Sequence, residues 1–260
     1  MTETTKAALA KIRQLPAKKA GADGVAEYFR ANRDRIAATI PKTMDVERME
    51  LLAIEAIRKT PDLQQCTVSS LFGALLNCAT IGLEPNTALG HAYLLPFNNT
   101  RAQTKDVQVL IGYKGWRELA RRAGSLRDIY AYPVYEADQF HAQLGTDPRI
   151  DHVPSLASEK GQIVAFYAVA HLMTGGTEIN LMSKREVDRI KSFSMTRGQS
   201  GPWRDHYAAM GCKTVLKPLA MAQLMTRDLA RAAEIEEHGG ETFDAEQQAE
   251  PDSETKEGAE

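Results

Sequence analysis

Apolar residues recur at helical spacing in the first third of the chain, and this pattern predicts a block of helices. The first helix is expected to start at Asp23, whose side chain suits an N-cap, and to carry its apolar face as far as Ile40. Two further helices are predicted, over Met44–Lys59, where Pro61 ends the pattern, and over Thr67–Gly82, which closes on a glycine.

The middle of the chain changes to the two-residue period of β-strands. Strands are predicted over His91–Phe97, Val107–Gly112, Asp128–Phe140, Gln162–Met173 and Thr177–Met182. A short helix over Lys114–Gly124 interrupts them, and the pair Gly175-Gly176 is expected to turn the last two strands into a hairpin. Because helical blocks lie on both sides of these strands, the pattern indicates an α+β fold with central antiparallel strands.

The last third of the chain returns to helical spacing. Ser183 followed by Glu186 predicts a capping box, and two more helices are expected after Pro202, with Pro218 between them. From Glu234 onward, Gly, Gln, Ser and acidic residues predominate, which is typical of a disordered tail. We therefore predict a mobile basic arm over residues 1–22, a single α+β domain over 23–233 and an acidic disordered tail over 234–260.

Charge is distributed unevenly between these parts. The whole chain has 32 Lys and Arg against 34 Asp and Glu, a formal net charge of −2. Residues 234–260 contain 11 of the acids and one of the bases, which leaves 31 bases and 23 acids in the preceding 233 residues. A basic body with an acidic tail suggests a polyanionic partner.

Several classes of protein are excluded by composition. The longest apolar run, Ile163–Ala170, is far shorter than the roughly 18–20 residues of a membrane span, and Met1–Ala20 lacks the apolar segment of a secretory signal. Cys66, Cys78 and Cys212 are scattered and odd in number, which argues against disulfides and favours buried thiols in a reducing cytoplasm.

The sequence also lacks the common signatures of nucleotide and hydrolytic sites. None of the 18 glycines precedes a lysine, so there is no phosphate-binding P-loop, and no GxGxxG, GxSxG or HExxH motif is present. We therefore expect no cofactor and no ATP-driven activity.

The predicted helix after Gly112 is two-sided. Its apolar side is expected in the core and consists of Trp116, Leu119, Ala120 and Ala123. Its basic side consists of Lys114, Arg117 and Arg121, extended by Arg122 and Arg127. Such a face can bind phosphates through counterion release, although an ordinary solvated helix face has the same pattern.

A second stripe follows Pro202. If this segment forms a single helix, one side of that helix carries Trp203, His206, Tyr207, Met210, Thr214 and Lys217, and Lys213 lies beside them. Aromatic rings next to lysines are typical of single-stranded nucleic acid channels, but a core stripe edged by lysines is the alternative. The preceding loop, with Arg197 and Gly198, is either a mobile flap or a solvated connection.

A metal-dependent nuclease is a weaker hypothesis. The acids and histidines that would support it are Asp128, Glu136, Asp138, His141, Asp147, Asp151 and His152. Because they follow no fixed nuclease spacing, we expect no metal site.

Three long blocks of sequence resemble one family. The first runs from Leu76 to Ala79, through Gly82-Leu83-Glu84-Pro85-Asn86, to Leu89–Phe97; the second is Ile111–Trp116 followed by Leu119–Gly124; the third joins Gly201-Pro202-Trp203, His206-Tyr207, Met210 and Lys213–Lys217. In order and spacing, these blocks resemble the RecT family of phage-type single-strand annealing proteins over about residues 25–233. The third block departs from the family pattern, because Cys212 and Pro218 stand where the family usually has bases.

The resemblance implies a non-enzymatic protein that coats single-stranded DNA and anneals it to a complementary strand in homologous recombination, without ATP. It implies a homo-oligomer, as a ring or helical filament, acting in the cytoplasm beside a 5′→3′ exonuclease. The DNA-binding residues expected from it, together with the charge pattern, are Tyr113, Lys114, Arg117, Arg121, Arg122, Arg127, Arg197, Trp203, Lys213 and Lys217.

Four points stay open at this level. The turn Gly112–Gly115 either lets backbone approach phosphates or needs a positive φ, and residues 23–60 are a candidate subunit surface. The acidic tail masks the DNA site, docks a partner such as an exonuclease or a single-strand binding protein, or only aids solubility. A nuclease and a scaffold without any DNA role remain the alternative functions.

Overall fold

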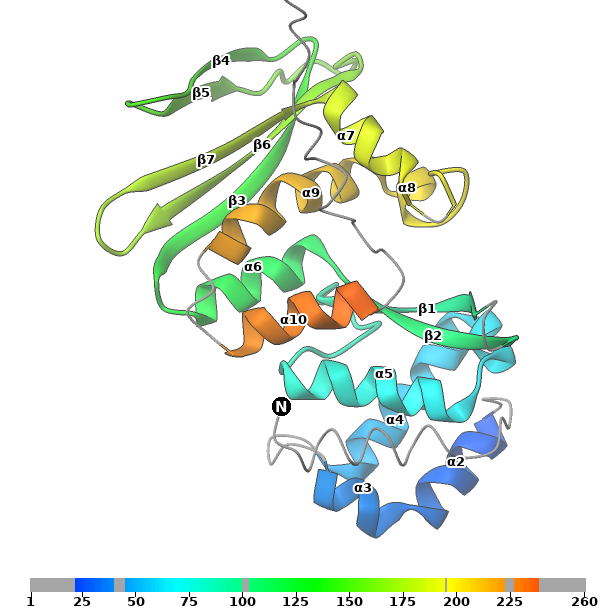
Figure 1. The fold of residues 1–260 in the computed structure, drawn as a ribbon. Helices are drawn as coiled ribbons and strands as arrows, with labels where there is room; N and C mark the ends of the chain where they lie inside the picture. The colour runs from blue at the N-terminus through cyan, green and yellow to red at the C-terminus, as the bar shows by residue number, and fades with distance from the viewer. Residues whose placement is uncertain (1–21, 40–44, 100–102, 195, 223–226, 239–260) are drawn as a thin grey trace, which may run out of the picture.

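The computed structural model describes residues 22–39, 45–99, 103–194, 196–222 and 227–238 (Figure 1). The predicted basic arm lies outside these ranges except for Ala22, and so does the predicted acidic tail beyond His238. Within them, helices flank antiparallel strands, which confirms the α+β fold. No helix in the described ranges is long and apolar enough to span a membrane.

The N-terminal block contains the helices α2 (Ala22–Ala31), α3 (Arg33–Thr39), α4 (Val46–Lys59) and α5 (Val68–Thr80), with a 3-10 turn η1 (Pro61–Gln65). The predicted second and third helices are confirmed: the side chains of Asp45 and Thr67 cap α4 and α5 by accepting backbone N–H groups. The predicted first helix is wrong in two respects. It begins at Ala22, so that Asp23 lies inside it, and it is divided into α2 and α3 at Asn32, whose side-chain amide donates to the Tyr28 carbonyl.

A hairpin of β1 (Ala92–Asn99) and β2 (Thr104–Ile111) packs on α5 and leads into α6 (Tyr113–Arg122). Both strands and the short helix agree with the prediction. In Figure 1 this hairpin lies between the N-terminal block and the remaining strands and helices.

A three-stranded antiparallel sheet follows, in the order β3 (Leu126–Tyr135), β6 (Ile163–Leu172) and β7 (Thr177–Ser183). Its two faces alternate residue by residue along each strand. The inner face, with Ile129 and Phe166, belongs to the main core and is covered by α9 (Tyr207–Ala222). A Cβ atom at Gly211 of α9 would collide with the Phe166 ring, so glycine lets this helix lie directly on the sheet.

The long strand predicted over Asp128–Phe140 is wrong at its end, because the chain turns after Tyr135. The turn is held by Asp138, whose carboxylate accepts the N–H groups of Tyr135 and Ser155 and contacts His152 Nε2 at 3.1 Å. Burial alone would raise the pKa of Asp138, but these hydrogen bonds outweigh it and lower the pKa. A hairpin that the sequence did not predict follows, β4 (Gln139–Gln143) with β5 (Arg149–Val153).

The C-terminal part contains α7 (Lys184–Ser192), α8 (Pro202–Asp205), α9 and α10 (Arg227–His238). The predicted capping box of Ser183 and Glu186 is confirmed at the start of α7. Pro218 does not separate two helices but lies inside α9. Pro218 cannot donate to the Thr214 carbonyl; the Asn180 side chain donates to the adjacent Val215 carbonyl at 2.8 Å and ties this segment to the sheet.

Two further sequence predictions concern buried groups and the tail. Cys66, Cys78 and Cys212 are buried free thiols, as expected, and burial raises the pKa of Cys78 to about 12. Helix α10 includes Glu234 to His238, which were predicted to belong to the disordered tail, and the rest of the predicted tail lies outside the described residues.

Candidate nucleic-acid interface

Glycines set the position of α6 against the start of β1. A Cβ atom at Gly112 would lie 2.7 Å from the Gly90 carbonyl oxygen, and one at Gly115 would overlap the backbone of His91. Gly112 has a φ of −72° and caps the helix in extended conformation. Close packing of two backbone segments accounts for these glycines. Neither of the roles suggested from the sequence, approach of the backbone to phosphates or a positive φ, is needed to explain them.

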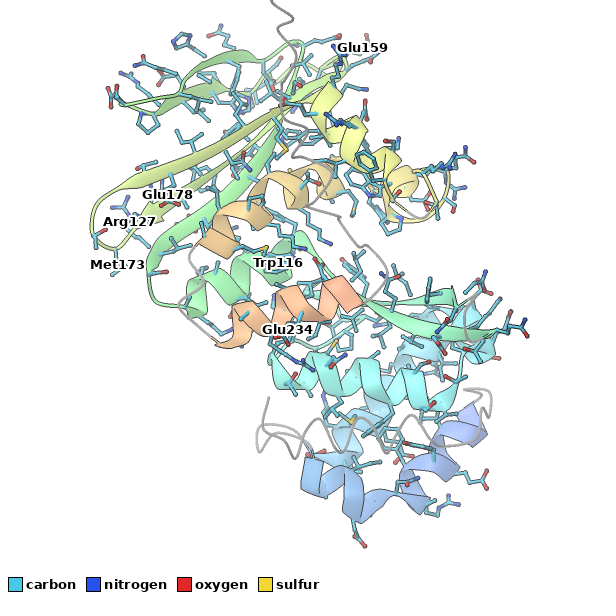
Figure 2. The ribbon with its side chains drawn as sticks, viewed as in Figure 1. Trp116, Arg127, Glu159, Met173, Glu178 and Glu234 are labelled. Carbon is cyan, nitrogen blue, oxygen red and sulfur yellow. The ribbon has the colours of Figure 1, made fainter. Side chains whose placement is uncertain are left out.

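The apolar side of α6 is buried as predicted. Trp116, Leu119 and Ala120 are inaccessible to solvent and pack where α9 and α10 meet α6 (Figure 2). The ammonium of Lys217 on α9 lies 5.3 Å from the centroid of the Trp116 ring, a cation–π distance. Trp116 is thus a core residue and not a surface stacking platform.

The opposite side of α6 carries four bases, of which Arg117 is half-buried against β3 and the other three are exposed. We call this the α6 basic face, and it consists of Lys114, Arg117, Arg121 and Arg122. Arg117 Nη2 lies 3.2 Å from Asp128 Oδ1 on β3, and Glu118 lies within 3.8 Å of both Arg121 and Arg122. Since Arg127 is exposed on β3 next to Asp128, the region combines five bases with two acids.

Tyr113 connects this face to the sheet rather than projecting from it. Its hydroxyl accepts the N–H of Ala131 at 3.3 Å, and burial raises its pKa. For the neighbouring Arg117, burial opposes the charge, but the hydrogen bond to Asp128 outweighs it and raises the pKa of Arg117. Helix α6 is therefore held to β3 at two points, through Tyr113 and Arg117, while Lys114 and Arg121 of the α6 basic face are exposed.

Lys213 and Lys217 do not join the α6 basic face. Their ammonium groups lie 2.7 and 2.8 Å from the carboxylate of Glu236 on α10, which also accepts the N–H of Ile111. The exposed fractions of the three side chains are 7% for Lys213, 32% for Lys217 and 8% for Glu236. The structure thus places Lys213 inside the protein in an ion triad, and not on the surface where a phosphate contact was predicted.

The remaining predicted residues lie at another place. In Figure 1, α9 separates α6 from the α7–α8 end of the molecule, which carries Arg197 and Trp203. Because α8 ends at Asp205 before α9 begins, the predicted single stripe is divided between two helices. Trp203 is buried against Tyr207, with ring centroids 6.2 Å apart, whereas Arg197 is exposed in the loop after α7.

Helix α7 contributes bases that were not singled out from the sequence. Lys184 and Lys191 place their ammonium groups 5.9 and 5.3 Å from the Tyr207 ring centroid. The Tyr207 hydroxyl donates to Asp188 at 2.8 Å, and burial together with this bond raises the pKa of Tyr207. The sequence has four bases within Lys184–Lys191, and these could have indicated a basic helix. Nothing in the sequence showed that Tyr207 packs against two of them.

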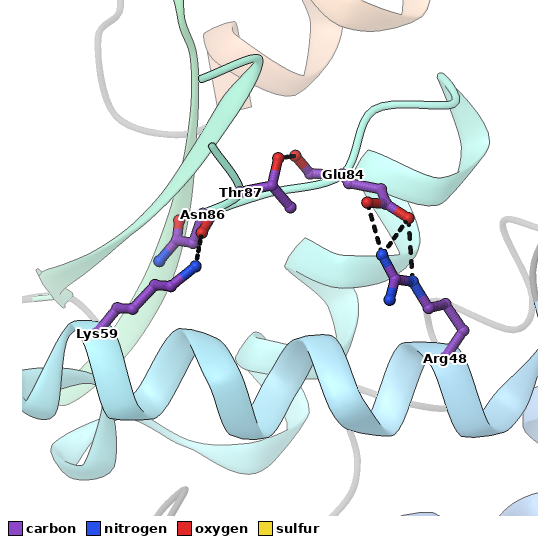
Figure 3. A network of polar contacts seen from close by, with 5 residues as sticks. All are labelled: Arg48, Lys59, Glu84, Asn86 and Thr87. Atoms are coloured by element: carbon purple, nitrogen blue, oxygen red, sulfur yellow. Dashed lines mark hydrogen bonds and ion pairs between the residues drawn. The ribbon is translucent and has the colours of Figure 1, made fainter. Parts of the chain in front are cut away.

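The motif Glu84-Pro85-Asn86, part of the first block of resemblance, has a structural role in the described chain (Figure 3). Arg48 of α4 holds the Glu84 carboxylate with contacts of 2.8 Å, and the Lys59 ammonium donates to the Asn86 carbonyl at 2.6 Å. Asn86, with a φ of +55°, accepts the Leu94 N–H through its side chain. The motif therefore fastens α4 to the start of β1.

The residues considered as metal ligands are separated into different contacts. Asp128 pairs with Arg117, Asp151 with Arg149, and Asp138 with His152. Among the described residues, no three His, Cys, Asp or Glu side chains come close enough together to hold a metal ion.

Comparison with known proteins finds relatives that match most of the chain. The profile of the RecT family matches residues 47–253. Protein RecT of Escherichia coli (strain K12) is 37% identical over 214 residues, which cover 82% of this chain and 79% of that protein. The uncharacterised protein YqaK of Bacillus subtilis (strain 168) is 26% identical over 184 residues, covering 70% of this chain and 61% of that protein.

Proposed function

The chain belongs to the RecT family, and we propose that it binds single-stranded DNA and anneals complementary strands without ATP. The observation that carries the proposal is the α6 basic face, since one helix presents four bases and is held to the edge strand β3 through Arg117. Clustered cations of this kind bind phosphates by releasing counterions, independently of base sequence.

The chemistry of annealing explains why no fuel is required. Base pairing and stacking supply the free energy of duplex formation, whereas phosphate repulsion and structure within each strand slow it. A basic surface that binds the backbone screens the repulsion and extends the strand, leaving the pairing edges of the bases free. The same proposal includes a homo-oligomer and partners such as a 5′→3′ exonuclease or a single-strand binding protein.

The test compares binding of a labelled single strand over a range of salt concentrations. We expect replacement of Lys114 and Arg121 by glutamine to weaken binding to all sequences alike, and to reduce the salt slope by about 1.4, since each lost phosphate contact removes roughly 0.7. Arg58, exposed on α4, is the matched control and should have no effect when changed to glutamine.

An unchanged slope in the double variant would reject the α6 basic face as the binding surface. Absence of any binding by the unmodified protein would reject the proposed function. Shortening of the labelled strand on addition of Mg²⁺ would instead favour the nuclease alternative.

A further inference from the structure

The outer face of the β3-β6-β7 sheet carries a row of aromatic rings. We call it the tyrosine row, and it consists of Tyr130, Tyr132, Tyr167 and His171. Ring centroids lie 5.7 Å apart for Tyr130 and Tyr132, 6.1 Å for Tyr132 and Tyr167, and 5.8 Å for Tyr130 and His171. The row therefore runs across two adjacent strands as one contiguous aromatic surface.

One ring of this row is buried and its neighbour is exposed. Tyr167 is buried beneath the β4–β5 hairpin, where its ring stacks on Phe140 at 5.7 Å and its hydroxyl lies 3.0 Å from His152 Nδ1. Tyr132, by contrast, is 51% exposed, although its neighbour Ala131 on the inner face is buried in the core. An aromatic ring kept half in solvent beside a rigid ring pair is suited to receive another flat group.

Cations lie along β3, the strand that carries the exposed ring of Tyr132. Arg117 of the α6 basic face pairs with Asp128, which precedes Tyr132 by four positions on β3. Arg127 directly precedes Asp128 on the same strand and is exposed. Figure 2 shows Arg127 near the turn that joins β6 and β7. Exposed rings next to bases match a ligand that presents both flat apolar faces and regularly spaced negative charges.

We propose that Tyr132 and Tyr130 stack on nucleobases of a bound single strand, while the α6 basic face contacts its phosphates. This inference rests on the proposed function and specifies which surface holds the bases. The ring spacing of 5.7–6.1 Å exceeds the ~3.4 Å rise per base in B-form DNA, so a strand that follows the row is stretched. Stacking engages only the faces of the bases, which leaves their pairing edges available to the incoming strand.

The experiment measures the affinity of two single-stranded probes of equal length and charge, one of thymidines and one of abasic sites. The unmodified protein should bind the thymidine probe more tightly. Tyr132→Ser should lower affinity for that probe about tenfold and leave affinity for the abasic probe unchanged, whereas Tyr132→Phe, which keeps the ring, should behave as the unmodified protein. Leu51→Ser removes an exposed apolar side chain on α4, at 45% exposure, and serves as the control.

Equal affinity of the unmodified protein for both probes, or full discrimination by Tyr132→Ser, overturns the stacking proposal while the proposed function stands. A variant that changes the sedimentation of the protein without DNA and loses affinity equally for both probes also overturns it, because the row would then be a subunit contact. Failure of the unmodified protein to bind either probe rejects the proposed function. Thermal unfolding of each variant shows whether the fold is retained.

Discussion

The ion triad of Lys213, Lys217 and Glu236 leads to a sharp prediction about stability. Glu236 is the buried anion that fastens α10 to α9, and it also accepts the N–H of Ile111. Changing Glu236 to glutamine preserves its shape but leaves two neighbouring ammonium groups without a counter-charge. Removal of one partner from a buried pair typically costs about 3 kcal/mol in the free energy of unfolding.

For a protein of this size, such a loss lowers the melting temperature by about 6–12 °C. The matched control is Glu234→Gln on the same helix. The Glu234 side chain is 55% exposed and pairs with Arg231 at 3.0 Å, so its replacement should change the free energy of unfolding by less than about 1 kcal/mol.

The pH dependence follows from the same triad. Burial alone would raise the pKa of Glu236, but Lys213 and Lys217 outweigh it, so the pKa of Glu236 is lowered in the folded state. Its contribution to stability is therefore present above the unfolded-state pKa, about 4.3, and is lost as the pH falls through the lower folded-state pKa.

Urea unfolding at several pH values measures both effects. The unmodified protein should lose more stability on acidification than Glu236→Gln, which lacks this group. A variant within 1 kcal/mol of the unmodified protein at pH 7, with the same loss in acid, would refute the assignment of the triad.

Two further predictions concern backbone geometry, and urea unfolding measures each. Gly115→Ala should destabilise the protein by about 2 kcal/mol, because the added Cβ overlaps the backbone of His91. Gly73→Ala should stabilise the protein by up to about 1 kcal/mol, because open space surrounds Gly73 in α5. Equal effects of the two substitutions would contradict the packing described for α6. Asn86→Gly should lower the free energy of unfolding by about 1 kcal/mol, because the hydrogen bond to the Leu94 N–H is lost. Asn86→Ala should lower it by about 1 kcal/mol more, because alanine is strained at the positive φ of this position. Identical losses would contradict a left-handed backbone at residue 86.

Local signals in the sequence were sufficient for most of the fold. The capping box at Ser183, and apolar periodicity along α4, α5 and α6, act within a few residues and predicted those helices. The β4–β5 hairpin was missed because His141 and Asp151 lie among many polar residues, which suggested a loop with acidic side chains. Its stability depends on Phe140 packing against Tyr167, a contact between strands far apart in sequence.

The candidate site was predictable only where it lies on one helix. The α6 basic face follows directly from helical spacing, and the burial of Trp116 was expected for the same reason. Lys213 was misplaced because its partner Glu236 lies in a segment whose composition resembled a tail. The tyrosine row was missed because Tyr130 and Tyr132 become neighbours of Tyr167 and His171 only when β3 pairs with β6.

The triad also changes how lysine substitutions on α9 are interpreted. Lys213 and Lys217 are expected from the sequence to contact DNA, but replacing both by alanine also leaves Glu236 buried without a counter-charge. Loss of DNA affinity in that double variant therefore reports on stability as well as on DNA contact. Substitutions on the α6 basic face avoid this ambiguity because those side chains face solvent.

Annealing itself tests the central claim most directly. Complementary oligonucleotides, one with a fluorophore and the other with a quencher, are mixed with the protein in the absence of ATP, and duplex formation is followed by quenching. We predict that pairing is accelerated, that non-complementary strands give no quenching, and that replacing Lys114 and Arg121 by glutamine reduces the acceleration. Pairing at the rate observed without protein would contradict the proposed function.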